Sequence, residues 1–165
     1  GATKPNWDIA ATAMVSGQKG IVLVEAKAHH AELSDAGKSP GGNPSNADRI
    51  RAAICQANAG LGGAQAGWNL TTDSHYQLCN RFAWSWKIAS LGVPVILVYL
   101  GFLNAMEMRQ PFRSAIEWSN VIRGHAEGIV PNDAWDRPID VNGTKMRAII
   151  QSVDPYNESH YVPRN

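Results

Sequence analysis

Two charged residues close an otherwise apolar segment of the sequence. The run Ile21-Val22-Leu23-Val24 is followed directly by Glu25-Ala26-Lys27. A run of this kind predicts a buried strand, in which residues two positions apart point to the same face. A carboxylate and an ammonium at the end of a buried strand are costly unless they pair or bind something. The pair is therefore either a salt-bridged strand end or part of a site.

A third charged residue, Asp8, approaches the pair through a predicted β-hairpin. Residues 7–15 and 21–28 each predict a strand, and the polar, glycine-containing segment 16–20 between them is typical of a turn. With Gly17-Gln18 as a two-residue turn, Asp8 lies opposite Lys27, and Glu25 is its diagonal neighbour. Such neighbours are about 5–8 Å apart. A longer turn would slip this register.

Two carboxylates and a lysine at one edge of a sheet suit a hard divalent cation. The ligands would be the carboxylates of Asp8 and Glu25 and the backbone carbonyl of Ala26, a set appropriate for Mg²⁺ or Mn²⁺. The ion would acidify a bound water and neutralise charge on a phosphoryl oxygen. Lys27 could position that water or stabilise the developing negative charge.

The order Asp, turn, apolar strand and Glu-x-Lys resembles the PD-(D/E)XK nuclease superfamily, which has the restriction-endonuclease-like fold. The resemblance implies that Asp8 and Glu25 hold Mg²⁺ and that Lys27 assists the attacking water. Many members carry a Gln in a helix after this strand, and Gln77 resembles its counterpart. Gln77 and Arg81 share one face of that predicted helix. We expect Gln77 to orient Lys27 or a water.

Two features depart from the superfamily pattern. Pro5 does not directly precede Asp8, so the Pro-Asp dipeptide is absent. Many members also have a Glu in an N-terminal helix, and no helix is predicted before Asp8. Either a native N-terminal helix has been removed or this protein lacks one.

The remaining elements predict one α/β domain over residues 1–165. Helices are expected over residues 47–61, 74–91 and 113–124, and further strands over 93–100 and 144–153. The glycines from Gly60 to Gly67 are expected to end the first helix. This order predicts a central mixed sheet flanked by helices, and the resemblance implies a three-layer restriction-endonuclease-like sandwich.

Composition limits the classes of function. The formal net charge is +1, so the whole chain does not show the strong positive charge of many nucleic-acid binders, although a local basic groove is compatible with it. The longest apolar run, residues 93–103, is too short to span a membrane as a helix. Cys55 and Cys79 do not form a zinc motif, and two buried thiols are expected. We expect a cytoplasmic protein without a membrane partner.

The leading hypothesis is a magnesium-dependent nuclease that hydrolyses phosphodiester bonds, with DNA favoured over RNA. His29, which shares the face of Glu25 and Lys27, and Arg81 are expected to contact the substrate. A homodimer would supply the two sites that cleavage of a duplex often needs. One rival is a catalytically inactive module of the same fold that binds a partner. Another is a metal-independent hydrolase that uses Asp8 and Glu25 as an acid and base pair.

Overall fold

The computed structural model describes residues 6–15, 17–38 and 44–156. They form a mixed five-stranded sheet with the strand order β1-β2-β3-β5-β4. The strands are β1 (Ile9–Val15), β2 (Gln18–Lys27), β3 (Val95–Phe102), β4 (Pro138–Val141) and β5 (Thr144–Val153). β2, β3 and β5 run parallel to one another, and β1 and β4 are antiparallel edge strands. The α/β class and the mixed sheet are as predicted.

The β1-β2 hairpin has a different register from the predicted one. Val15 pairs with Gln18 and Ile9 pairs with Val24, so the predicted pairing of Asp8 with Lys27 is wrong by two positions. Gly17, with φ +80°, provides the left-handed backbone of the turn. Gln18 and Lys19 therefore belong to β2, and extending the register by one residue brings Asp8 level with Glu25.

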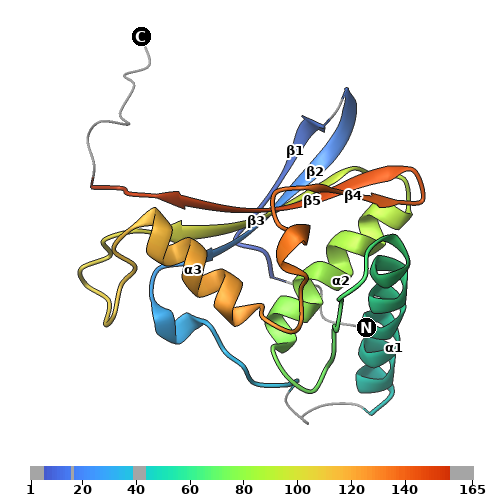
Figure 1. The fold of residues 1–165 in the computed structure, drawn as a ribbon, viewed down its shortest axis with the longest axis horizontal. Helices are drawn as coiled ribbons and strands as arrows, with labels where there is room; N and C mark the ends of the chain where they lie inside the picture. Colours follow the sequence, from blue (N-terminus) through green and yellow to red (C-terminus); the bar gives the residue numbers. More distant parts are fainter. Residues whose placement is uncertain (1–5, 16, 39–43, 157–165) are drawn as a thin grey trace.

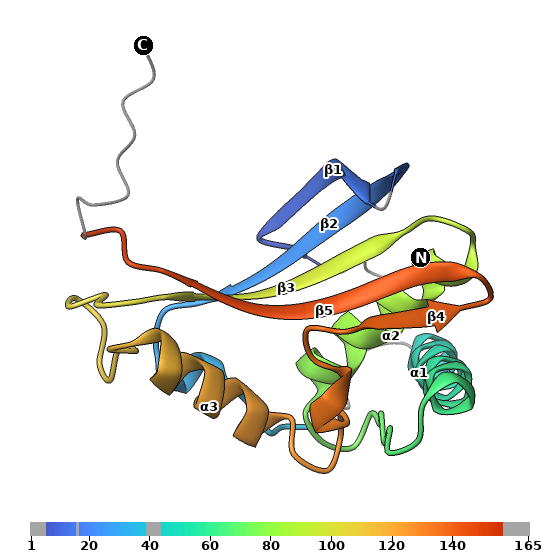
Figure 2. The same cartoon turned by 45° about the horizontal axis from the view of Figure 1, so that its top comes forward.

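Three α-helices cover one face of the sheet within the described part of the chain (Figures 1 and 2). They are α1 (Pro44–Ala64), α2 (Tyr76–Ser90) and α3 (Ala115–His125), with short 3-10 turns at His30–Glu32 and Asn132–Ala134. The connections from β2 to β3 and from β3 to β5 step in the same direction along the sheet. Right-handed connections of that kind place their helices on the same side. The described residues thus form two layers, whereas helices on both faces were expected.

The core lies between this helical layer and the sheet. Alternate residues of β3 (Val95, Leu97 and Tyr99) are almost completely buried against the helices. Gly101 continues the same face of β3, and a side chain there would overlap the indole of Trp118 on α3. Gly101 therefore allows α3 to approach β3 closely. Gly101 also pairs with Lys27, so this close approach lies beside the end of β2.

Several expectations about the other elements need correction. α1 continues through Gly60 to Ala64, because helix–helix packing against α2 outweighs the weak helix propensity of glycine. β4 was not predicted. Two buried thiols were expected, but Cys55 is exposed and Cys79 is buried. No helix in the described ranges is long and apolar enough to cross a bilayer.

Candidate functional site

Glu25 and Lys27 lie at the carboxyl end of β2, under the helical layer, and both are buried. Lys27 Nζ donates to Glu25 Oε1 over 2.6 Å, and the two side chains are 8 % and 3 % exposed. The predicted strand explains this arrangement, because alternate residues of β2 face the helices. The two charges therefore form a buried pair.

α2 supplies two more of the predicted residues to the same cluster. Gln77 Nε2 donates to Glu25 Oε1 over 2.7 Å, and Arg81 Nε donates to Glu25 Oε2 over 2.5 Å. Gln77 and Arg81 are four positions apart, which places both on the helix face that meets β2. The structure therefore brings together Glu25, Lys27, Gln77 and Arg81, and we call these four residues the Glu25 cluster.

Arg81 also contacts the segment that precedes β1. Its Nη2 donates to the backbone carbonyl of Asn6 over 2.8 Å, and its guanidinium lies 4.5 Å from the centre of the Trp7 ring. The side chain is only 8 % exposed. Arg81 thus positions Glu25 and anchors the segment before β1, and its contact with substrate stays a prediction.

Asp8 lies at the rim of the Glu25 cluster and is exposed. Its Oδ2 accepts a hydrogen bond of 2.7 Å from the backbone N–H of Ala26, and its own N–H donates to the carbonyl of Val24 over 3.2 Å. Asp8 is therefore held next to Glu25 by hydrogen bonds to the backbone of β2 on either side of that residue. The carbonyl of Ala26, predicted as a metal ligand, belongs to the peptide unit that follows this bonded N–H.

Tyr99 adds an uncharged donor beside the cluster. It pairs with Glu25 across β2 and β3, and its hydroxyl is buried without a hydrogen-bond partner among the described residues. Burial raises the pKa of Tyr99 well above its usual value, and the negative charge of Glu25 raises it further. The hydroxyl therefore stays protonated and could donate a hydrogen bond. The helix predicted over residues 74–91 was expected to contribute to the site, but a contribution from Tyr99 on β3 was not expected.

His29, the other predicted substrate contact, lies just beyond β2. Its backbone N–H donates to Glu32 Oε2 over 3.2 Å, and its ring Nε2 is 3.9 Å from the same oxygen. These contacts belong to the 3-10 turn that follows the strand. The structure therefore places His29 with Glu32 and not in the Glu25 cluster.

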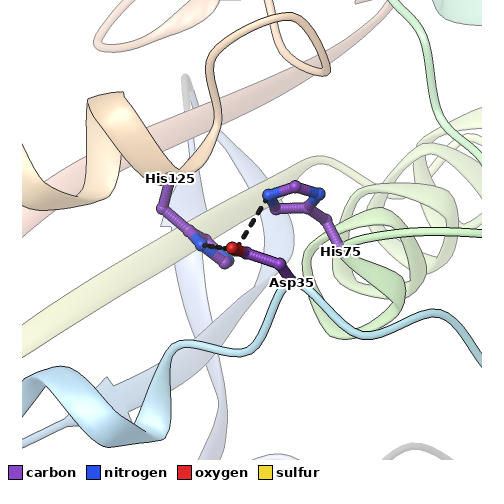
Figure 3. Close-up of side chains that lie close together, drawn as sticks. All are labelled: Asp35, His75 and His125. Atoms are coloured by element: carbon purple, nitrogen blue, oxygen red, sulfur yellow. Dashed lines mark ion pairs between the residues drawn. The ribbon is translucent and has the colours of Figure 1, made fainter.

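A second group of polar residues was not predicted as a site (Figure 3). Asp35 Oδ1 lies 3.0 Å from His75 Nε2 and 3.2 Å from His125 Nδ1. The three residues come from the loop before α1, the residue before α2 and the last residue of α3. His75 was expected near solvent at a helix start. It does precede α2, but its side chain is only 21 % exposed.

Comparison of the chain with models of known protein families, with curated proteins and with solved structures gives no match in any of the three. The function is therefore inferred from the residues and their geometry.

Proposed function

We propose that this protein is a metal-dependent phosphodiesterase that acts on nucleic acid, built on a restriction-endonuclease-like fold. The observation that carries the proposal is the meeting of Glu25, Lys27 and Gln77 within hydrogen-bond distance at the end of β2. These residues come from two elements 50 positions apart, and each was expected in the site. The mixed sheet and its parallel β2-β3-β5 core are compatible with that fold, although the described helices cover only one face of the sheet.

The residues present fit a divalent ion at one position. A carboxylate offers about four acceptor sites, and Glu25 uses three of them: two on Oε1 for Lys27 and Gln77, and one on Oε2 for Arg81. One acceptor site on Oε2 is left for a ligand bond. The exposed carboxylate of Asp8 and the Ala26 carbonyl would complete the protein ligands of Mg²⁺ or Mn²⁺.

The charges at the site suggest that ion and substrate bind together. Asp8 and Glu25 carry two negative charges, and Lys27 and Arg81 carry two positive charges. A divalent cation would leave this group with excess positive charge, which a phosphodiester would offset. We therefore expect the ion to bind more tightly when nucleic acid is present.

Each protein group has a defined part in the proposed hydrolysis. Bound Mg²⁺ would supply an acidified water and neutralise charge on the phosphoryl group. Lys27 has three N–H donors, one of which is on Glu25, so the others can orient the attacking water or stabilise charge on the phosphate. Gln77 and Arg81 keep the Glu25 carboxylate in place, and Tyr99 can donate to a group that enters beside it.

A second candidate function is a non-catalytic module of the same fold that binds a partner. The observation in its favour is that Glu25 already accepts hydrogen bonds from three protein donors. A buried carboxylate satisfied in this way needs no ion to remain stable. In that case the Glu25 cluster would hold α2 against β2 and nothing more.

Cleavage assays separate the two candidates. Plasmid, linear duplex, single-stranded DNA and RNA are incubated with the protein in Mg²⁺, in Mn²⁺ or in a chelator. The decisive variant is Asp8→Asn, because the amide oxygen can still accept from the Ala26 N–H while the charge that would hold the ion is lost. We expect cleavage by the native chain and a rate about a hundredfold lower in the variant, the size typical of losing one electrostatic contact to the transition state.

Asp140→Asn is the matched control, since Asp140 is an exposed carboxylate in the β4-β5 hairpin, remote in sequence from the site, and should leave the rate unchanged. An unchanged rate in Asp8→Asn would contradict the proposal. A native chain that binds nucleic acid but cleaves no substrate would favour the module. Cleavage that persists in chelator would instead point to metal-independent acid and base catalysis.

A further inference from the structure

Asp35, His75 and His125 present three ligand atoms of two chemical kinds to one point. The three atoms all lie within 4.8 Å of one another. In a tetrahedral site with metal–ligand bonds of about 2.0–2.1 Å, neighbouring ligand atoms are about 3.3 Å apart. The observed separations from Asp35 Oδ1, 3.0 Å to His75 Nε2 and 3.2 Å to His125 Nδ1, are close to that spacing.

The backbone holds two of the three ligands together independently of their side chains. The N–H of His75 donates to the carbonyl of Asp35, and the N–H of Tyr76 donates to the carbonyl of Ala36, each over 3.0 Å. His75 itself adopts a left-handed backbone with φ 47°, an uncommon conformation for a residue with a side chain. This backbone geometry occurs at the point where the His75 ring turns toward Asp35 (Figure 3).

Both imidazoles lie beside the same carboxylate oxygen and are largely shielded from solvent. The side chain of His125 is 9 % exposed and that of His75 is 21 % exposed. Histidine is the commonest metal ligand among protein side chains. Asp35 is 78 % exposed, so an ion could enter from its side and keep water ligands.

We propose that Asp35, His75 and His125 form a binding site for a divalent transition-metal ion of the zinc class. Two imidazole nitrogens and one carboxylate suit Zn²⁺, Co²⁺ or Fe²⁺, whereas Mg²⁺ prefers oxygen ligands alone. Three protein ligands leave at least one position for water. The site is separate from the Glu25 cluster in its ligands, and its existence does not depend on the proposed phosphodiesterase activity.

Bound metal would also connect parts of the fold. The ion would link the loop after β2 to the start of α2 and the end of α3. Because α2 carries Gln77 and Arg81, the same ion would restrict motion of the helix that holds Glu25. We therefore expect the ion to raise the midpoint of thermal unfolding as well as to bind.

The test uses Co²⁺ alone, added to chelator-treated protein without an affinity tag, and follows visible absorption and binding heat. We expect one tightly bound ion with the strong absorption of a site of low coordination number. Asp35→Asn, His75→Gln and His125→Gln should each weaken binding by at least about tenfold, since even loss of an outer partner of a ligand has that effect. Zn²⁺ should displace Co²⁺, and Mg²⁺ should not.

His30→Gln is the matched control. His30 Nε2 lies 3.2 Å from Glu117 Oε1, so His30 and Glu117 form another histidine–carboxylate pair. This pair contains one imidazole, whereas the proposed site contains two. Its removal should leave Co²⁺ binding unchanged. The proposal is overturned if the native chain binds no stoichiometric Co²⁺, or if Asp35→Asn binds it as well as the native chain does. If a histidine variant fails to fold, the result for Asp35→Asn is the decisive one, because Asp35 is exposed.

Discussion

Glu25 is the residue on which the arrangement of the described interior charges depends. Its carboxylate forms ion pairs with both Lys27 and Arg81, and all three side chains are at most 8 % exposed. Taking charges out of water costs several kcal/mol for each ion, and a close partner repays part of that cost. Loss of Glu25 would leave two buried cations close together.

We expect Glu25→Ala to destabilise the protein by about 3–5 kcal/mol, the usual effect of removing one partner from a buried ion pair. The measurement is the free energy of unfolding from urea titration monitored by circular dichroism. Asp140→Asn breaks the exposed pair with Lys145 and should leave the unfolding midpoint almost unchanged. Equal effects of the two substitutions would show that the Glu25 cluster has no special part in stability.

The residues of this cluster that are linked by local geometry could be predicted from the sequence. Glu25 and Lys27 follow from alternation along one strand, and Gln77 and Arg81 follow from helical spacing. The register of Asp8 was wrong because a two-residue shift of the turn changes every pair in the hairpin. Asp35 and His125 had no local signal at all, since 90 residues separate them and only the tertiary fold brings them to His75.

At the scale of elements, α1 contains glycines in two different environments. A side chain at Gly60 would overlap the indole of Trp86 on α2, whereas a side chain at Gly62 would meet nothing within 4 Å. Gly60 therefore permits close packing of α1 against α2, and Gly62 has no such role. The glycine-rich composition alone did not reveal this difference, and the helix was expected to end there.

These environments predict opposite effects of one substitution. Gly62→Ala should stabilise the protein by about 0.5–1 kcal/mol, because alanine has the higher helix propensity and its methyl group faces open space. Gly60→Ala should destabilise it, by about 1–3 kcal/mol, because Trp86 or the helix must move. Thermal or urea unfolding of both variants measures the difference. Effects of the same sign would contradict the packing of α1 on α2 described here.

The β4-β5 hairpin could have been predicted from the Asn-Gly dipeptide in its turn. Asn142 and Gly143 connect the two strands, with φ 53° and 84°. Asn-Gly between apolar strands is typical of a tight hairpin turn with two left-handed residues. The strand over 144–153 was placed correctly, but its short partner, Pro138–Val141, was taken for part of a loop.

At the scale of the whole molecule, both groups of polar residues lie where the end of β2 and the loop after it meet the helices. α2 supplies Gln77 and Arg81 to the Glu25 cluster, and the residue just before it, His75, belongs to the second group of polar residues (Figure 3). The end of β2 and the loop that follows it supply Glu25, Lys27 and Asp35. Apart from β4, the order of elements could be predicted from periodicity, but the placement of all described helices on one face depends on the direction of the crossovers.

The most direct test of the central claim is the position of Mn²⁺ in crystals of the protein grown with a short oligonucleotide. Anomalous diffraction locates the ion without assuming any activity. We expect a peak between Asp8, Glu25 and the carbonyl of Ala26, stronger with the oligonucleotide than without it. A structure with bound oligonucleotide and no ion at that position, or with Mn²⁺ only among Asp35, His75 and His125, would contradict phosphodiester hydrolysis at the end of β2.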